Sequence, residues 1–191
     1  LCGPQDEIKY LKGLSKHMLS EKNIELLREG AKKYNVVLSN EQTDKFSHYA
    51  RLLVEWNEKI NLTSITDPEE IVIKHFLDSL SVAEYIPNET KALVDVGTGA
   101  GFPGIPLKII RENLKVTLLD SLAKRINFLN EVCNYLNLED IFSIHSRAED
   151  FGADKKYRES FDLVTARAVA SLPVLLEYCL PLVKVGGMFI A

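Results

Sequence analysis

Three glycines spaced two residues apart constrain this chain more than any other feature; they lie in Gly97-Thr98-Gly99-Ala100-Gly101. The run follows a short apolar segment at 92–96 and precedes a helix predicted from Pro103 to about Glu112. Glycine lets the backbone approach a ligand closely and adopt positive φ. Open α/β sheets bind ligands outside the carboxyl ends of their strands. The loop therefore predicts a ligand site at the end of a buried strand.

Strands and helices alternate after Lys91, as the hydrophobic pattern shows. Short apolar runs predict strands at 92–96, 116–119, 141–144, 161–165 and 188–191, the last after a turn at Gly186-Gly187. Helices are predicted at 103–112, 121–136 and 171–183. This alternation implies an α/β fold, with a mostly parallel sheet, right-handed crossovers and helices on both faces.

The preceding part of the chain is predicted to be helical. One helix begins near Ser20, and a second is capped at Ser39 or Asn40 and ends near Asn61. A third begins around Thr66-Asp67-Pro68 and runs to about Tyr85. Proline in the first turn and acidic residues at the positive end of the helix dipole favour that third start.

These patterns predict three segments. Residues 18–88 form an N-terminal helical extension, and residues 89–191 form the α/β domain. Residues 1–17 are mostly polar, and we expect them to be foreign to the fold, with a native start at Met18.

Composition narrows the classes of function. The 191 residues are 46% hydrophobic and 26% charged, which is typical of a globular protein. No apolar run approaches the roughly 18 residues of a membrane-spanning helix, so a cytoplasmic protein is expected. Cys2, Cys133 and Cys179 lack metal-ligand spacing, so we expect small buried hydrophobes and no metal. The net charge of −4 means that a nucleic-acid partner needs a local basic patch.

Two kinds of ligand compete for the glycine loop. Gly99-x-Gly101-x-x-Gly104 matches the dinucleotide pattern, but its first glycine comes three residues after the strand. The other candidate is the acidic-x-G-x-G-x-G loop of S-adenosylmethionine (SAM) enzymes. There Asp95 would receive the ligand's ammonium, directly or through water. A pyrophosphate gains nothing from a neighbouring carboxylate, so Asp95 favours SAM.

The ends of the next two strands suit the same ligand. Asp120 ends the second strand, where a carboxylate can accept both ribose hydroxyls. Its structural alternative is that Asp120 and Ser121 only cap the next helix. The third strand ends at Ser146-Arg147-Ala148-Glu149-Asp150, where an adenine ring commonly sits and a nearby acid reads its edge.

The fourth strand ends at Thr165-Ala166-Arg167-Ala168, a position that normally faces the reacting atoms. It is neither N-P-P-Y nor D-P-P-Y, the motifs with which amino-group methyltransferases grip an exocyclic NH2. No cysteine lies near it to support a covalent cytosine-C5 mechanism. The segment therefore gives no support to methylation of an exocyclic amino group or of cytosine C5.

The quoted segments resemble the bacterial RsmG/GidB family, guanine-N7 methyltransferases of 16S ribosomal RNA, over about residues 18–191. The resemblance lies in Trp56-Asn57, Asn61-Leu62-Thr63, His75-Phe76-Leu77-Asp78-Ser79, Asp95–Pro106, Asp120–Phe128, Ser146–Asp150 and Thr165–Leu172. It implies a class I SAM-dependent methyltransferase fold, which is Rossmann-like, with an N-terminal helical extension. The sixth and seventh strands of that fold follow the point where this sequence stops, so we expect a truncated α/β domain.

The resemblance also implies a ligand set and partners. It carries cofactor contacts onto Gly97, Phe102, Asp120, Ser121, Ala148, Glu149 and Arg167, beside Asp95, Gly99 and Gly101 of the loop argument. The cofactor is SAM and the product S-adenosylhomocysteine. The expected partner is 16S rRNA or the small ribosomal subunit, and the protein is expected to be a monomer.

Guanine N7 carries an in-plane lone pair and no proton, so its attack on the sulfonium methyl requires no general base. Catalysis would then rest on positioning and electrostatics. An arginine bonded to N7 would block the lone pair, so Arg167 is predicted to hold O6, a phosphate or the cofactor carboxylate. His75 and Asp78 share one face of the third helix. They either line the target pocket or tie helix to sheet by buried hydrogen bonds.

Four residues are candidates for RNA contact. Lys124, Arg125 and Arg147 lie near the carboxyl ends of the second and third strands, where they can form the basic patch that the net charge lacks. Their structural alternatives are a solvated helix face and a loop ion pair. Asn61 either contacts a base or ends its helix.

Three other functions stay open. An NAD-dependent dehydrogenase would need hydride-transfer residues on the later strands, and no His or Tyr-x-x-x-Lys appears there. A small-molecule SAM methyltransferase would use the N-terminal helices as a lid over an apolar pocket. A non-catalytic assembly protein would retain only SAM binding.

Overall fold

The computed structural model describes residues 18–191, so the expectations for residues 1–17 and for Cys2 lie outside the described residues. Five parallel strands form one sheet in the order β3-β2-β1-β4-β5. Their bounds are β1 Ala92–Val96, β2 Lys115–Asp120, β3 Ile141–His145, β4 Phe161–Thr165 and β5 Val183–Ile190. The predicted α/β fold is confirmed.

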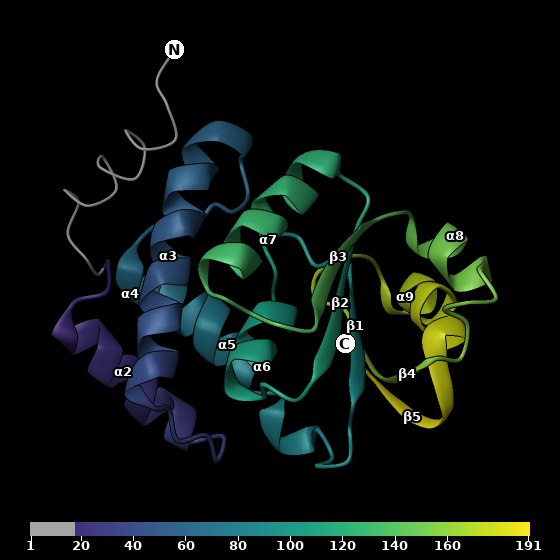
Figure 1. The fold of residues 1–191 in the computed structure, drawn as a ribbon, viewed down its shortest axis with the longest axis horizontal. Coiled ribbons are helices and arrows are strands. Elements are labelled where there is room, and N and C mark those ends of the chain that lie inside the picture. The colour runs from purple at the N-terminus through teal and green to yellow at the C-terminus, as the bar shows by residue number, and fades with distance from the viewer. Residues whose placement is uncertain (1–17) are drawn as a thin grey trace.

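Helices cover both faces of the sheet (Figure 1). On one face lie α6 (Gly104–Ile110) and α7 (Ala123–Tyr135); on the other lie α8 (Ala148–Ala153), α9 (Leu172–Cys179) and the 3₁₀-helix η3 (Leu180–Leu182). The strand order reverses between β1 and β4. Ligands of such sheets bind at this reversal, outside the carboxyl ends of the strands.

The N-terminal extension begins with two capped helices. Ser20 caps α2 (Glu21–Lys32), and Ser39 caps α3 (Asn40–Ile60) in a capping box with Gln42. Both starts agree with the prediction. Such caps satisfy backbone N–H groups that have no partner within the helix.

The third helix of the extension differs from the prediction. In place of one helix to Tyr85, the chain forms α4 (Pro68–Ile71), the π-helix η1 (Val72–Leu77), α5 (Asp78–Leu80) and the 3₁₀-helix η2 (Ala83–Tyr85). Asp67 caps the start. Hydrophobic spacing does not separate a π-turn from an α-turn, and π-turns occur frequently at functional sites.

The predicted turn at Gly186-Gly187 was wrong, and one helix of the α/β domain was missed. Gly186-Gly187 is no turn before a strand, because both glycines lie inside β5. Gly186 has φ +80°, and the pairing of β5 with β4 shifts register between Phe161 and Leu163. The glycines thus accommodate an irregularity within the strand. Helix α8 was not predicted.

The extension and the sheet share one hydrophobic core. Phe46 and Tyr49 of α3 and Phe76 of η1 are fully buried, and they join the same cluster as Leu93 of β1. The Tyr49 hydroxyl donates a hydrogen bond to the backbone oxygen of Ala100 in the glycine loop. The extension therefore supports the loop directly.

The structure also bears on the cysteines, on membrane-spanning helices and on metal sites. Cys133 and Cys179 are buried, as expected. No helix among residues 18–191 is long and apolar enough to cross a membrane. The same residues contain no group of three or more His, Cys, Asp or Glu side chains that could hold a metal ion.

Candidate methyltransferase site

A pocket of about 400 Å³ lies at the carboxyl ends of β1, β2 and β3. Six residues singled out from the sequence line it: Gly97, Asp120, Ser121, Arg147, Ala148 and Glu149. They come from three successive strand-to-helix connections. The parallel sheet brings these connections to one edge.

The glycines of the loop have different surroundings. Gly97, at φ +65°, lines the pocket, and a Cβ there would lie 2.6 Å from the side chain of Val169. Gly99 donates its N–H to Asp120. A Cβ on Gly101 would lie 2.7 Å from the Tyr49 hydroxyl, on the side of the helical extension. Of the three predicted cofactor-binding glycines, only Gly97 forms part of the pocket wall.

Asp95 does not face the pocket as predicted, because its side chain is fully buried beneath the glycine loop. One carboxylate oxygen accepts hydrogen bonds from the Thr98 hydroxyl at 2.6 Å and from Gly104 N–H at 3.0 Å. The other accepts one from the Thr165 hydroxyl of β4 at 2.9 Å. Burial raises the pKa of Asp95 to about 6, against the lowering effect of these donors. Asp95 thus shapes the loop from within.

Asp120 lines the pocket, and its carboxylate is almost fully engaged. One oxygen accepts from Leu122 N–H, and the other accepts from Gly99 N–H at 2.9 Å and from Arg125 Nη1 at 3.2 Å. The exposed fraction of Asp120 is 2%. Arg125, one of the residues predicted to contact RNA, thus forms an ion pair with the carboxylate of Asp120.

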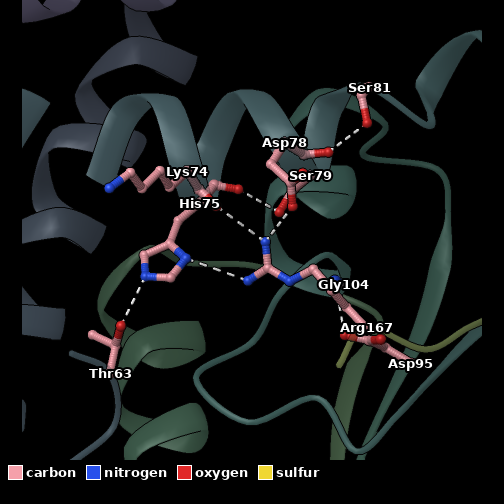
Figure 2. Close-up of polar contacts among 9 residues, drawn as sticks. All are labelled: Thr63, Lys74, His75, Asp78, Ser79, Ser81, Asp95, Gly104 and Arg167. Atoms are coloured by element: carbon pink, nitrogen blue, oxygen red, sulfur yellow. Dashed lines mark hydrogen bonds and ion pairs between the residues drawn. The ribbon is translucent and has the colours of Figure 1, made fainter. Parts of the chain in front are cut away.

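Arg167, two residues after the end of β4, reaches across to the N-terminal extension (Figure 2). Its Nη1 donates to Asp78 at 2.6 Å and to the backbone oxygen of Lys74 at 3.4 Å. Its Nη2 donates to His75 Nδ1 at 3.3 Å. His75 and Asp78 therefore tie helix to sheet, one of the two roles left open by the sequence.

Phe102 lies under this cluster and not in the pocket wall. Its ring stacks on His75 with centroids 4.5 Å apart and 9° between the planes, and the Arg167 guanidinium lies 5.1 Å from its centroid. Burial foremost, and then the charge of Arg167, lower the pKa of His75 to about 4. His75 is thus neutral near pH 7.

Comparison with known proteins identifies the family. The sequence profile of a family described as GidB, rRNA small subunit methyltransferase G, matches residues 42–191. The chain belongs to this family. It is therefore a methyltransferase with SAM as its cofactor.

Two relatives in the GidB family show the extent of the similarity, and both are named ribosomal RNA small subunit methyltransferase G. The Acetivibrio thermocellus relative is 61% identical over 166 residues, 87% of this chain and 69% of that protein. The Desulfitobacterium hafniense relative is 56% identical over 174 residues, 91% of this chain and 72% of that protein.

A solved structure supports the class I fold of this GidB-family chain. A Methanococcus maripaludis protein assigned to the SAM-dependent methyltransferases superposes with a TM-score of 0.54 at 14% identity. The superposition covers 73% of this chain and 60% of that protein. At this identity the likeness concerns the fold alone.

Among the pocket residues of this GidB-family chain that sequence reasoning did not single out are Val169 and Tyr178. Val169 follows Arg167 by two residues, and Tyr178 comes from α9 on the far face of the sheet. A hydrogen bond between Tyr178 and Glu149 raises the tyrosine pKa. Val169 lies inside the quoted segment Thr165–Leu172 but carries no polar group that would mark it as a site residue. No local motif marks Tyr178, because the packing of α9 against α8 brings it to the pocket.

The remaining RNA candidates lie on the exposed surface. Lys124 is exposed in the first turn of α7, and Arg147 is exposed in the pocket wall, directly before α8. Asn61 ends α3 in the left-handed conformation at φ +46°, so the helix-ending interpretation holds for its backbone.

Proposed function

We propose that this chain transfers the methyl group of SAM to N7 of a specific guanine in 16S ribosomal RNA. Family membership supports rRNA as the substrate, since the relatives carry that name. The observation that carries the choice of N7 is the chemistry of the cluster formed by Arg167, His75, Asp78 and Phe102.

The shape of the pocket and its hydrogen-bond acceptors support a cofactor site here. It is concave, with Gly97 at a close backbone approach and the carboxylates of Asp120 and Glu149 on its wall. Asp120 would hold the ribose hydroxyls and the segment Ala148–Glu149 the adenine. When bound, SAM supplies an electrophilic methyl group on a sulfonium sulfur. The residues of the chain then need only orient cofactor and target.

The cluster is poorly suited to remove a proton. Both nitrogens of His75 are engaged, and its pKa of about 4 makes it a weak base. Asp78 is held in an ion pair by Arg167. A guanine N7 atom has no proton to lose, so its methylation needs no general base. An exocyclic amino group would need one, together with a gripping motif that the segment Ala166–Ala168 lacks.

Arg167 supplies the positive charge of the site. A guanidinium carries five N–H groups, and among residues 18–191 the Arg167 guanidinium donates three hydrogen bonds, to Lys74, Asp78 and His75. The two that remain can donate to guanine O6, a phosphate or the cofactor carboxylate. A fixed cation beside the target is the kind of electrostatic positioning that this reaction requires.

The proposed partner is 16S rRNA or the small ribosomal subunit in the bacterial cytoplasm. We propose that the protein binds it as a monomer and uses no metal ion. The overall negative charge makes the local cations decisive. Arg147 in the pocket wall, together with Lys124 and Arg125 in the first turn of α7, is proposed to contact phosphates. Asn61 is proposed to lie near the target.

The test uses SAM with a labelled methyl group. The protein is incubated with small subunits, and separately with naked 16S RNA, from a strain that lacks the gene. Borohydride–aniline cleavage then maps N7-methylguanine. We expect label at one guanine and a loss of at least about 100-fold in rate for Arg167→Ala, since misplaced reacting groups cost about that much.

Arg158→Ala is the matched control, because Arg158 is an exposed arginine before β4, outside the cluster and the pocket. It should keep the wild-type rate. SAM binding without transfer to either RNA would refute the rRNA substrate and favour a small-molecule acceptor or an assembly role. Label on a guanine amino group would refute the N7 assignment.

A further inference from the structure

We propose that Thr63 is a positioning residue of this site: its hydroxyl locks the His75 ring, and the locked ring holds Arg167 at the end of β4. The inference rests on the proposed function for its catalytic consequence. It concerns a residue outside the pocket and outside the predicted site. Thr63 lies in the loop between α3 and α4.

Thr63 and Arg167 contact the two opposite nitrogens of the His75 imidazole (Figure 2). Thr63 Oγ1 lies 2.9 Å from His75 Nε2, and Arg167 Nη2 lies 3.3 Å from His75 Nδ1. The ring of Phe102 covers one face of the imidazole in parallel stacking. The histidine is thus held at both nitrogens and on one face.

The donor inventory fixes the direction of this relay. A guanidinium has no acceptor, so His75 Nδ1 must accept the hydrogen bond from Arg167. A neutral imidazole then carries its proton on Nε2, and that N–H must donate to the Thr63 hydroxyl oxygen. The low pKa of His75 agrees with a neutral ring. The contacts thus assign one tautomer.

Thr63 is itself fixed by two backbone hydrogen bonds. Its N–H donates to Asn57 Oδ1 at 2.8 Å, and its Oγ1 also accepts from Ile65 N–H at 3.0 Å. With His75 as second donor, both lone pairs of the hydroxyl oxygen are used. The loop after α3 therefore presents an acceptor of set direction to the imidazole.

Loss of the hydroxyl would release the ring. Without an acceptor at Nε2, the imidazole can tilt or change tautomer, and an N–H at Nδ1 would oppose the donors of Arg167. The charged or titratable groups facing His75 are Arg167 from the β4 loop and Asp78 from α5. Neither can replace Thr63, because both lie on the Nδ1 side of the cluster.

The experiment compares Thr63→Val with Thr63→Ser in the full chain. ¹⁵N-edited NMR of the histidine rings reports the protonated nitrogen of His75 and the exchange of its proton with water. We expect a protected Nε2–H in wild type and Thr63→Ser, and its loss in Thr63→Val. In methyl-transfer assays, kcat should fall about 10-fold in Thr63→Val, with KM for SAM within about twofold of wild type. Thr63→Ser should restore kcat.

Thr66→Val, at an exposed threonine of the same loop, is the matched control and should change neither readout. A protected Nε2–H or an unchanged kcat in Thr63→Val would overturn the proposal. So would a protonated Nδ1 in the wild type. Failure of Thr63→Ser to restore kcat would assign the role to the methyl group. If the wild type transfers no methyl to rRNA, the proposed function fails, and the NMR arm still decides whether Thr63 locks His75.

Discussion

The carboxylate of Asp95 lies beneath the glycine loop, where three donors converge on it from Thr98, Gly104 and Thr165. Two of these donors belong to the loop and the start of α6, and the third belongs to β4. One side chain therefore joins the turn that forms the pocket to the strand that carries Arg167. Buried networks of this kind contribute most when every member is satisfied.

Asp95→Asn tests this network. The amide has the same shape as the carboxylate. Its NH2 group, however, would face an N–H or O–H donor where a carboxylate oxygen had accepted a hydrogen bond. We expect the free energy of unfolding near pH 7 to fall by about 2 kcal/mol, because a buried donor is left unsatisfied. Urea denaturation measures the fall, and calorimetry should show weaker SAM binding. Glu58→Gln, at an exposed position on α3, should change stability by less than about 0.5 kcal/mol. Equal stability of the two variants would contradict the assigned role.

Two buried groups give opposite pH dependences. The pKa of His75 is lowered from 6.5 to about 4, so its contribution to stability is present above 6.5 and lost as pH falls through about 4. The pKa of Asp95 is raised from 3.8 to about 6, so its contribution is present below 3.8 and lost as pH rises through about 6. Between these limits the two effects oppose each other.

His75→Gln separates the two effects. The variant loses the ring stacking and should be less stable than wild type near pH 7. It also loses the group that penalises the wild type on acidification, so the difference in unfolding free energy should narrow toward about pH 5. Urea titrations at both pH values measure it. A gap that widens on acidification would show that His75 is protonated in the folded protein.

The sequence allowed several residues of the pocket wall to be predicted, but it did not indicate which way every side chain points. Gly97, Asp120 and Glu149 were found from their places after strands, since parallel topology brings those places together. Asp95 and Phe102 turn away from the pocket. Their direction depends on donors and rings from β4 and the extension, which no local pattern records. The pairing of Arg125 with Asp120 was hidden for the same reason.

At the scale of elements, β5 shows what its glycines do. A Cβ on Gly187 would lie 2.9 Å from the backbone oxygens of Asp162 and Lys184. Backbone atoms in a paired strand cannot move away cheaply. Glycine is therefore required at this position by the packing of β5 against β4.

Gly187→Ala should destabilise the protein by about 2 kcal/mol, because overpacking against fixed atoms costs about that much. Thermal unfolding followed by circular dichroism measures the loss. Gly152→Ala in α8 is the contrasting variant. Its Cβ would meet Pro181 at an ordinary 3.4 Å, and alanine favours a helix by up to about 1 kcal/mol. Similar losses in both variants would contradict this account of β5.

Strands and helices with a clear hydrophobic pattern could be predicted from the sequence, whereas the π-helix and the shortest α-helices could not. Strand β4 was predicted at its observed bounds, Phe161–Thr165, because a short, mostly apolar run follows the polar segment that ends at Ser160. The π-turns of η1 were not predicted, since they keep the hydrophobic face of an α-helix within one turn. Helix α8 was missed because six residues are too few to show a period.

At the scale of the whole molecule, helices and sheet form one cooperative body. The core cluster runs from Leu27 in α2 to Leu163 in β4. We expect a single two-state unfolding transition. Trp56, the only tryptophan, lies in α3 beside Phe128 of α7, so its fluorescence reports the joint between extension and sheet. Its transition in urea should coincide with that of circular dichroism. A fluorescence change at lower urea would show that the extension detaches first.

The contacts of Arg167 also set an order in time. His75 and Asp78 precede it by 92 and 89 residues in the chain. Synthesis proceeds from the N-terminus at about 5–20 residues per second, so both acceptors leave the ribosome several seconds before their guanidinium. Contacts of such long range form late in folding. In each newly made copy, the face proposed to bind the target therefore stays incomplete until the segment that follows β4 has been synthesised.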